Sequence, residues 1–156
     1  MEYPTIEQMI FNSRDTIVWD DVKLYLKQYQ GSSYVVKEYG DLIHINYTTV
    51  DEYTGSKYTR RLRGAVVKAK ANLVQILPNL IESCCNRRWI KNMSDKHNNN
   101  ASKGWYRYDA GFELPVIHNG EKDWNRYRCI LLVMINDRGL YLYDVLNIRK
   151  EASNLR

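Results

Sequence analysis

The sequence predicts an α+β fold in which N-terminal helices and a hairpin precede a long helix and an antiparallel sheet. Three observations indicate it. Apolar residues recur at helical spacing in the first half of the chain, β-rich stretches fill the last third, and no repeat or linker separates them. The length of 156 residues, with 44% apolar and 26% charged residues, suits one folded unit. We therefore expect the helices to cover one face of the sheet.

The first fifty residues are expected to form two helices and a hairpin. Apolar residues recur at helical spacing over residues 6–10 and, more clearly, over residues 15–31, where an Asp and a Gly are suitable end residues. Residues 33–38 and 41–47 are rich in Val, Ile and Tyr, which favours strands. The dipeptide Tyr39-Gly40 between them predicts a tight turn, since Gly tolerates a positive φ.

The middle of the chain is expected to be helical between two loops. Residues 48–58 are polar and predict a loop, whereas residues 59–76 have one continuous apolar face and predict the long helix. Pro78 cannot continue a helical hydrogen-bond ladder, so it is expected to begin a separate short helix that ends at Cys85. Residues 86–103 are poor in aliphatic side chains and predict an exposed loop.

The last third of the chain predicts three antiparallel strands in a meander. The β-rich stretches are residues 105–116, 124–135 and 140–148. The first turn is indicated by Asn119-Gly120 and the second by residues 136–139.

The net charge of +5 is divided unevenly along the chain. Residues 1–56 carry four basic and nine acidic side chains, a net charge of −5, whereas the remaining residues carry +10. We expect an acidic N-terminal extension over residues 1–50, packed on or preceding a basic domain over residues 51–156. The basic part favours nucleic acid as a partner.

Several classes of protein are disfavoured. No apolar stretch approaches the ~18 residues of a membrane helix, the N-terminus lacks a leader pattern, and the three cysteines suit a reducing compartment. We therefore expect a cytoplasmic protein without membrane contact. No spacing typical of a zinc site, phosphate-binding loop, serine hydrolase or two-metal nuclease occurs. The sequence predicts no cofactor and no metal.

One histidine is a candidate for catalysis. His97 follows Lys96 in a stretch crowded with cations, which lower the pKa of an imidazole and could hold a phosphate. A neutral imidazole suits a general base near neutral pH. The alternative interpretation is a solvated loop without function. The surrounding cations are Arg87, Arg88, Lys91 and Lys103.

Basic and aromatic residues alternate at three places, namely residues 87–89, 105–108 and 124–128. Aromatic rings stack on unpaired bases and guanidinium groups bind phosphates, so this interleaving on a sheet predicts contact with single-stranded RNA. The alternative is that the aromatic side chains simply face the core.

The chain also resembles a known family over residues 48–151, about two thirds of its length. The strings that carry the resemblance are DEYTGSK at 51–57, RLRGA at 61–65, KAKAN at 68–72, NRRW at 86–89, DKH at 95–97, GWYRYD at 104–109, FELPV at 112–116 and LYLYDVLNIRKE at 140–151. They are similar to the C-terminal domain of phage head-morphogenesis MuF proteins and of large polyvalent proteins of mobile elements. That domain is assigned to the nuclease superfamily that unites barnase, EndoU, tRNA-cleaving colicins and RelE.

The resemblance implies one or two helices followed by a curved four-stranded antiparallel sheet, so three to four strands are expected in all. It also implies metal-independent RNA cleavage, in which a base deprotonates a ribose 2′-OH, a 2′,3′-cyclic phosphate forms and an acid protonates the leaving 5′-oxygen. We expect His97 as base or acid, Lys96 and Arg88 as transition-state charge, and Tyr143 or Tyr106 as the remaining proton donor. The expected RNA-binding residues are Arg61, Lys68, Arg87, Lys91, Lys103, Tyr108 and Arg126.

Two functions from different classes follow. The first is an endoribonuclease of a phage or mobile element, with tRNA or another single-stranded or structured RNA as its substrate. The second is a binding protein without catalysis, comparable to an anti-CRISPR protein, that inhibits a host defence complex by blocking a nucleic-acid-binding protein. The divided charge favours the second, because an acidic face can occupy a basic nucleic-acid channel.

Overall fold

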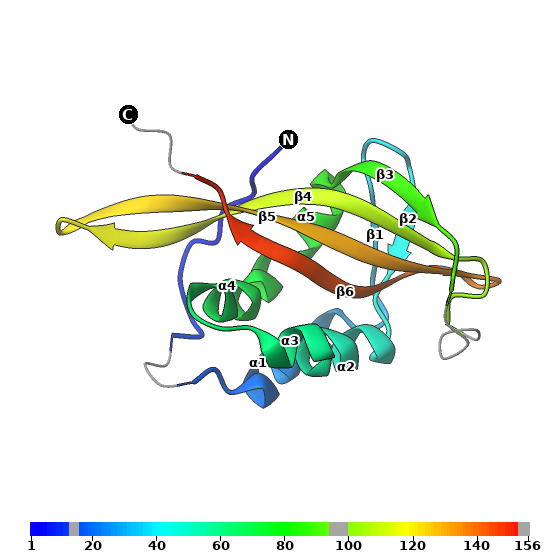
Figure 1. Ribbon diagram of the computed structural model, residues 1–156, viewed down its shortest axis with the longest axis horizontal. Coiled ribbons are helices and arrows are strands. Elements are labelled where there is room, and N and C mark those ends of the chain that lie inside the picture. The colour runs from blue at the N-terminus through cyan, green and yellow to red at the C-terminus, as the bar shows by residue number, and fades with distance from the viewer. Residues whose placement is uncertain (13–15, 94–99, 153–156) are drawn as a thin grey trace.

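The computed structural model describes residues 1–12, 16–93 and 100–152, and over these residues the fold is α+β (Figure 1). The described strands form one mixed six-stranded sheet in the order β1-β2-β6-β5-β4-β3. The expected number of three to four strands is therefore wrong, because the N-terminal hairpin joins the same sheet instead of standing apart from it.

Four consecutive antiparallel strands make up most of the sheet. They are β3 (Cys85–Ile90), β4 (Trp105–His118), β5 (Glu121–Asn136) and β6 (Gly139–Lys150). The β1 (Ser33–Val35) and β2 (Leu42–His44) hairpin adds to β6, with β2 parallel to it. The predicted hairpins are confirmed, and the β4–β5 hairpin extends well beyond the helices (Figure 1).

The helices gather on one side of the sheet (Figure 1). They are α1 (Trp19–Leu26), α2 (Tyr47–Gly55), α3 (Lys57–Arg61), α4 (Ala65–Leu73) and α5 (Leu77–Ser83), with 3-10 turns at Lys27–Tyr29 and Val74–Ile76. A separate short helix is present as predicted, but α5 begins at Leu77, one residue before Pro78, and ends at Ser83. Pro78 is tolerated there because the backbone N–H groups of a first helical turn have no partner within the helix.

The predicted helix over residues 6–10 is wrong, because no helix forms there and the chain just before it, at residues 4–6, pairs with β4. Thr5 forms a parallel bridge with Glu113, and the Ile6 amide donates to the Glu113 carbonyl oxygen at 2.9 Å. The apolar spacing there reflects burial of Ile6 in the core.

The predicted loop over residues 48–58 is also wrong, because α2 and the start of α3 lie there. Asn46 caps α2 with a reciprocal pair of hydrogen bonds to Thr49. Ser56 ends α2 and caps α3 by accepting from the Thr59 amide at 3.1 Å.

The predicted long helix over residues 59–76 is wrong as well. It is broken between α3 and α4, where Leu62 is extended and Gly64 has φ 69° and ψ −146°. That conformation is open almost only to glycine, so the helix must restart at Ala65. Similarly, the start of the predicted loop over residues 86–103 lies in β3.

The two faces of the sheet differ in what covers them. The inner face, which bears Tyr108 and Phe112 of β4, packs against the helices, and its core includes Ile6 and Val22 as well as Leu131. Residues on both sides of position 50 thus share one core. The alternate residues of β4 point to the opposite side, which we call the outer face.

The sheet curls until its two ends meet. β1 and β3 are its edge strands, yet the turn between β1 and β2 contacts both β3 and β4. The Tyr39 hydroxyl accepts from the Arg87 amide at 2.9 Å, and the Tyr108 hydroxyl donates to Asp41 Oδ2 at 2.7 Å. Within the described ranges, no helix is long and apolar enough to cross a membrane.

Candidate nucleic-acid interface

Five arginines lie on the outer face of the sheet, one or two on each of four neighbouring strands. The strand register brings them onto one surface, because directly opposed residues of antiparallel strands share a face. They are Arg88 of β3, Arg107 of β4, Arg126 and Arg128 of β5, and Arg149 of β6.

Two pairs of these arginines are directly opposed across neighbouring strands. Arg88 is the register partner of Arg107, and Arg128 is the register partner of Arg149. Like charges in directly opposed positions destabilise a sheet. An anionic ligand on the outer face would remove that repulsion.

Carboxylates compensate only part of this charge. Arg88 pairs with Asp109 at 3.0 Å, Arg126 with Glu113 at 3.1 Å and Arg128 with Glu151 at 2.6 Å. Five guanidinium groups against three carboxylates leave two positive charges. Consistent with this excess, the buried Arg107 Nε has no hydrogen-bond partner among the described residues.

An aromatic cluster closes one end of the outer face. Trp105 and Tyr143 meet edge to face with ring centroids 5.1 Å apart, and Leu132 and Tyr141 pack around them. Burial, together with the neighbouring charge of Glu52, raises the pKa of Tyr143, which holds it as a neutral phenol at physiological pH. Trp105 is only 8% exposed, so Tyr141 and Tyr143 are the more accessible rings.

The expected catalytic residues are only partly brought together. Lys96 and His97 lie outside the described residues. Arg88 and Tyr143 are both associated with the outer face, whereas Tyr106 contacts the inner side, where its ring lies 4.7 Å from the Arg87 guanidinium. Arg88 and Tyr106 therefore do not share a surface.

Arg87 and Tyr108 also belong to the inner side. Arg87 Nη1 donates to Asp41 Oδ1 at 2.9 Å and to Oδ2 at 2.8 Å, and this hydrogen bonding raises the pKa of Arg87. Tyr108 is fully buried and donates to the same carboxylate. These groups hold the β1–β2 turn against β4, which is a structural role.

The remaining predicted cations are distributed around the molecule. Arg61 is exposed at the end of α3, and Lys68 of α4 donates to Asn12 at 3.3 Å. Lys91 is exposed just after β3, and Lys103 pairs with Asp137 at 3.2 Å. Of the RNA-binding residues expected from the sequence, Arg126 is the one that lies on the outer face.

Three of the outer-face arginines, Arg107, Arg128 and Arg149, were not among the RNA-binding residues expected from the sequence. Arg107 and Arg128 do lie in the stretches 105–108 and 124–128 that predict RNA contact, whereas Arg149 does not. A signal for them was present, because Arg126 and Arg128 are two residues apart in a strand and must share a face. Their alignment with Arg107 and Arg149 depends on the register between strands, which bulges in β5–β6 alter.

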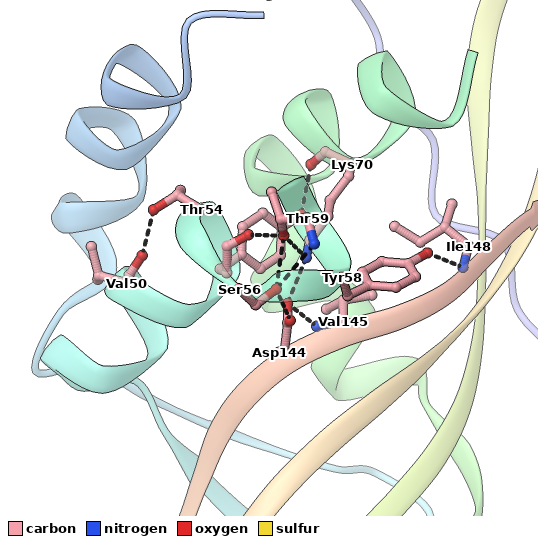
Figure 2. Close-up of polar contacts among 10 residues, drawn as sticks. Val50, Thr54, Ser56, Tyr58, Thr59, Lys70, Asp144, Val145 and Ile148 are labelled. Atoms are coloured by element: carbon pink, nitrogen blue, oxygen red, sulfur yellow. Dashed lines mark hydrogen bonds and ion pairs between the residues drawn. The ribbon is translucent and has the colours of Figure 1, made fainter. Parts of the chain in front are cut away.

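A buried ion pair lies on the other side of β6 (Figure 2). Lys70 Nζ is 2.6 Å from Asp144 Oδ1 and donates to Thr59 Oγ1 at 2.5 Å. Burial lowers the pKa of Lys70 and raises that of Asp144. Both side chains are at most 2% exposed, so they have no access to a substrate and act by joining elements of the fold.

In comparisons with known proteins, no protein family, no curated protein and no solved structure matches this chain. The resemblance to phage and mobile-element nuclease domains therefore stays a prediction, and the function is argued from the geometry.

Proposed function

We propose that this protein binds RNA through the outer face of its sheet. The observation that carries the proposal is that arginines face each other across neighbouring strands at two places. Arg88 is opposite Arg107, and Arg128 is opposite Arg149. Repulsion between like charges is unfavourable for folding, and a phosphate backbone offsets it.

A single strand fits this surface better than a duplex. The arginines lie across four strands of one sheet and the more accessible aromatic rings lie at its end, so phosphates and unpaired bases can be contacted together. Guanidinium groups suit phosphate oxygens because their paired N–H donors bind two oxygens at once.

We extend the proposal to metal-independent RNA cleavage. The ribose 2′-oxygen attacks the adjacent phosphorus as a base takes its proton, the bond from phosphorus to the 5′-oxygen breaks, and an acid protonates that oxygen. His97 would supply the base or the acid, with Lys96 and Arg88 stabilising the phosphorane charge. Tyr143 is the better remaining donor, because it borders the outer face on which Arg88 lies.

Binding is tested by the fluorescence anisotropy of labelled single-stranded RNA over a range of salt concentrations. We expect log affinity to fall linearly with log salt, with a slope of about −0.7 for each neutralised phosphate. The variant Arg107→Gln should bind more weakly. The matched control is Arg63→Gln, since Arg63 is exposed and, among the described residues, its side chain donates to the carbonyl oxygens of Arg60 and Leu62 alone.

Cleavage is tested separately, by incubating the protein with tRNA and total RNA in EDTA. The expected products end in a 2′,3′-cyclic phosphate, and His97→Ala should abolish them without changing the affinity for RNA. Undiminished cleavage by His97→Ala would exclude the proposed role of this histidine.

An inhibitory binding protein is the second candidate, favoured by the charge of −5 on residues 1–56 beside the basic remainder. A pull-down from nuclease-treated bacterial host extract should then recover a nucleic-acid-binding protein in stoichiometric amount. Recovery of RNA alone from untreated extract, with no such partner, would contradict this alternative.

A further inference from the structure

A small polar recess opens on the outer face beside the opposed arginines Arg128 and Arg149. Its volume is about 90 Å³. Since one water molecule occupies about 30 Å³ of liquid, the recess has room for roughly three waters. Its lining consists of Met1, Asp109, Ala110, Arg128, Cys129, Ile130, Asn147 and Arg149.

A bulge in the strand pairing shapes this recess. The register between β5 and β6 shifts between Arg128 and Ile130, and Asn147 has φ 51°, a left-handed conformation that Asn tolerates better than most residues. The extra residue brings Asn147 into the lining together with Arg149. Bulges of this kind are common beside functional sites because they redirect side chains.

The guanidinium groups in the recess retain unused donors. Arg149 forms no side-chain hydrogen bond or ion pair with any described residue. Arg128 uses its Nε for Glu151 and also interacts with the Tyr3 side chain, so it retains fewer of its five N–H donors.

The carboxylate in the recess is already engaged. Asp109 Oδ1 pairs with Arg88 at 3.0 Å, and its Oδ2 accepts from Asn86 Nδ2 at 2.7 Å. Glu151 lies just outside the lining and accepts hydrogen bonds from both the Tyr3 hydroxyl and Arg128 Nε. These bonds lower the pKa of Glu151. Asp109 is thus held by groups outside the recess, whereas Glu151 neutralises part of the Arg128 charge. Arg149 keeps its full charge and leaves the recess attractive to an anion.

We propose that the recess between Arg128 and Arg149 is a subsite for one phosphate group of the bound RNA. This inference rests on the proposed function and names the group that the surface recognises. Two guanidinium groups offer bidentate donors to phosphate oxygens, and the Asn147 amide can donate a further hydrogen bond. The volume has room for a phosphate group.

The first experiment measures thermal unfolding of the whole chain in potassium phosphate and in potassium chloride of equal ionic strength. Phosphate should raise the melting temperature of the unmodified protein by roughly 2 °C or more near saturation. Arg149→Gln should lose this shift. The control Lys150→Gln should keep it, because Lys150 is exposed on the neighbouring position of β6 that points to the opposite face.

The second experiment compares single-stranded RNAs of one sequence that carry a 5′-phosphate, a 3′-phosphate or no terminal phosphate. Arg149→Gln should bind the preferred RNA roughly tenfold or more weakly. Preference for one phosphorylated end identifies a terminal phosphate as the occupant. Equal affinity for all three RNAs, with the same loss in Arg149→Gln, identifies a phosphate of the backbone.

The outcomes separate this inference from the proposed function. RNA binding that is equally strong in the unmodified protein, Arg149→Gln and Lys150→Gln would overturn the subsite and leave the outer face as the RNA-binding surface. A phosphate shift that depends on Arg149, without any RNA binding, would support the subsite and overturn the proposed function. A phosphate shift that Arg149→Gln retains would also overturn the subsite.

Discussion

Lys70 Nζ lies 2.6 Å from Asp144 Oδ1, and this ion pair joins the helices to the strand on which the outer-face residue Arg149 lies. Ser56 Oγ donates to Asp144 Oδ2 at 2.7 Å (Figure 2). The Tyr53 hydroxyl donates to the Lys70 carbonyl oxygen at 2.7 Å. The pair therefore couples α2, α3 and α4 to β6.

We predict that Lys70→Met lowers the free energy of unfolding by about 3–5 kcal/mol, because it leaves a buried carboxylate without its cation. The measurement is urea denaturation of Lys70→Met, Asp144→Leu and the double variant. The double variant should lose less stability than the sum of the losses in the two single variants. The difference, the coupling energy, should be about 0.5–3 kcal/mol. Lys68→Met, at a partly exposed position of the same helix, is the control.

Lys70→Met should also change how the free energy of unfolding depends on pH. Burial already raises the pKa of Asp144, and Lys70 opposes that rise. Without Lys70 the pKa of Asp144 in the folded protein rises further above its pKa in the unfolded chain. The protonated Asp144 carboxyl then contributes stability that is fully present below the unfolded pKa. That contribution is lost as pH rises through the folded pKa. The measurement is the free energy of unfolding of both proteins at pH 4 and pH 7. If Lys70→Met became more stable relative to the unmodified protein as pH rises from 4 to 7, this assignment would be contradicted.

Gly64 is predicted to be sensitive to any side chain. Its φ of 69° and ψ of −146° are strained for other residues, so Gly64→Ala should cost about 1–3 kcal/mol in unfolding free energy. The matched control is Gly55→Ala at the end of α2, where φ is not positive and an added Cβ meets no atom within 4 Å. Equal stability of the two variants would argue against a strained break at Gly64.

Local turn chemistry explains which parts of the fold could be predicted. Asn119 and Gly120 have φ 51° and 78°, as expected of an Asn-Gly hairpin turn, and the strands on both sides were recognised by composition. Residues 48–58 were missed because they are polar. Their helix is specified by the Asn46–Thr49 capping box and by one buried face that includes Tyr53, rather than by a continuous apolar pattern.

The candidate interface was harder to predict than the strands that carry it. Alternation within a strand places Arg126 and Arg128 together, but pairing between strands brings in Arg107 and Arg149. Adjacent Arg87 and Arg88 appeared equivalent because residues 86–103 were predicted to be a loop. They lie in β3, where successive side chains point to opposite sides of the sheet. The pairing of β3 with β4 is a tertiary contact that leaves little trace in composition.

Alkaline conditions should destabilise the protein through its buried tyrosines. Burial raises the pKa of Tyr53 and Tyr108 well above 10.0, whereas in the unfolded chain both ionise near that value. Their contribution to stability is therefore complete below pH 10 and is lost as pH rises toward the folded pKa. Urea midpoints from pH 8 to pH 11 should fall less steeply in Tyr53→Phe than in Tyr47→Phe, since Tyr47 is 67% exposed.

The adjacent arginines Arg87 and Arg88 give the most discriminating test of the proposed interface. Arg88→Gln should weaken RNA binding and reduce the salt slope by about 0.7, the contribution of one phosphate contact, with little effect on stability. Arg87→Gln should leave the slope unchanged and cost about 1–3 kcal/mol in unfolding free energy, because it removes the hydrogen bonds from Nη1 to both carboxylate oxygens of Asp41. The measurements are anisotropy and urea denaturation of both variants. The reverse result, with Arg87→Gln changing the salt slope and Arg88→Gln leaving it intact, would place the RNA on the inner side near Tyr106.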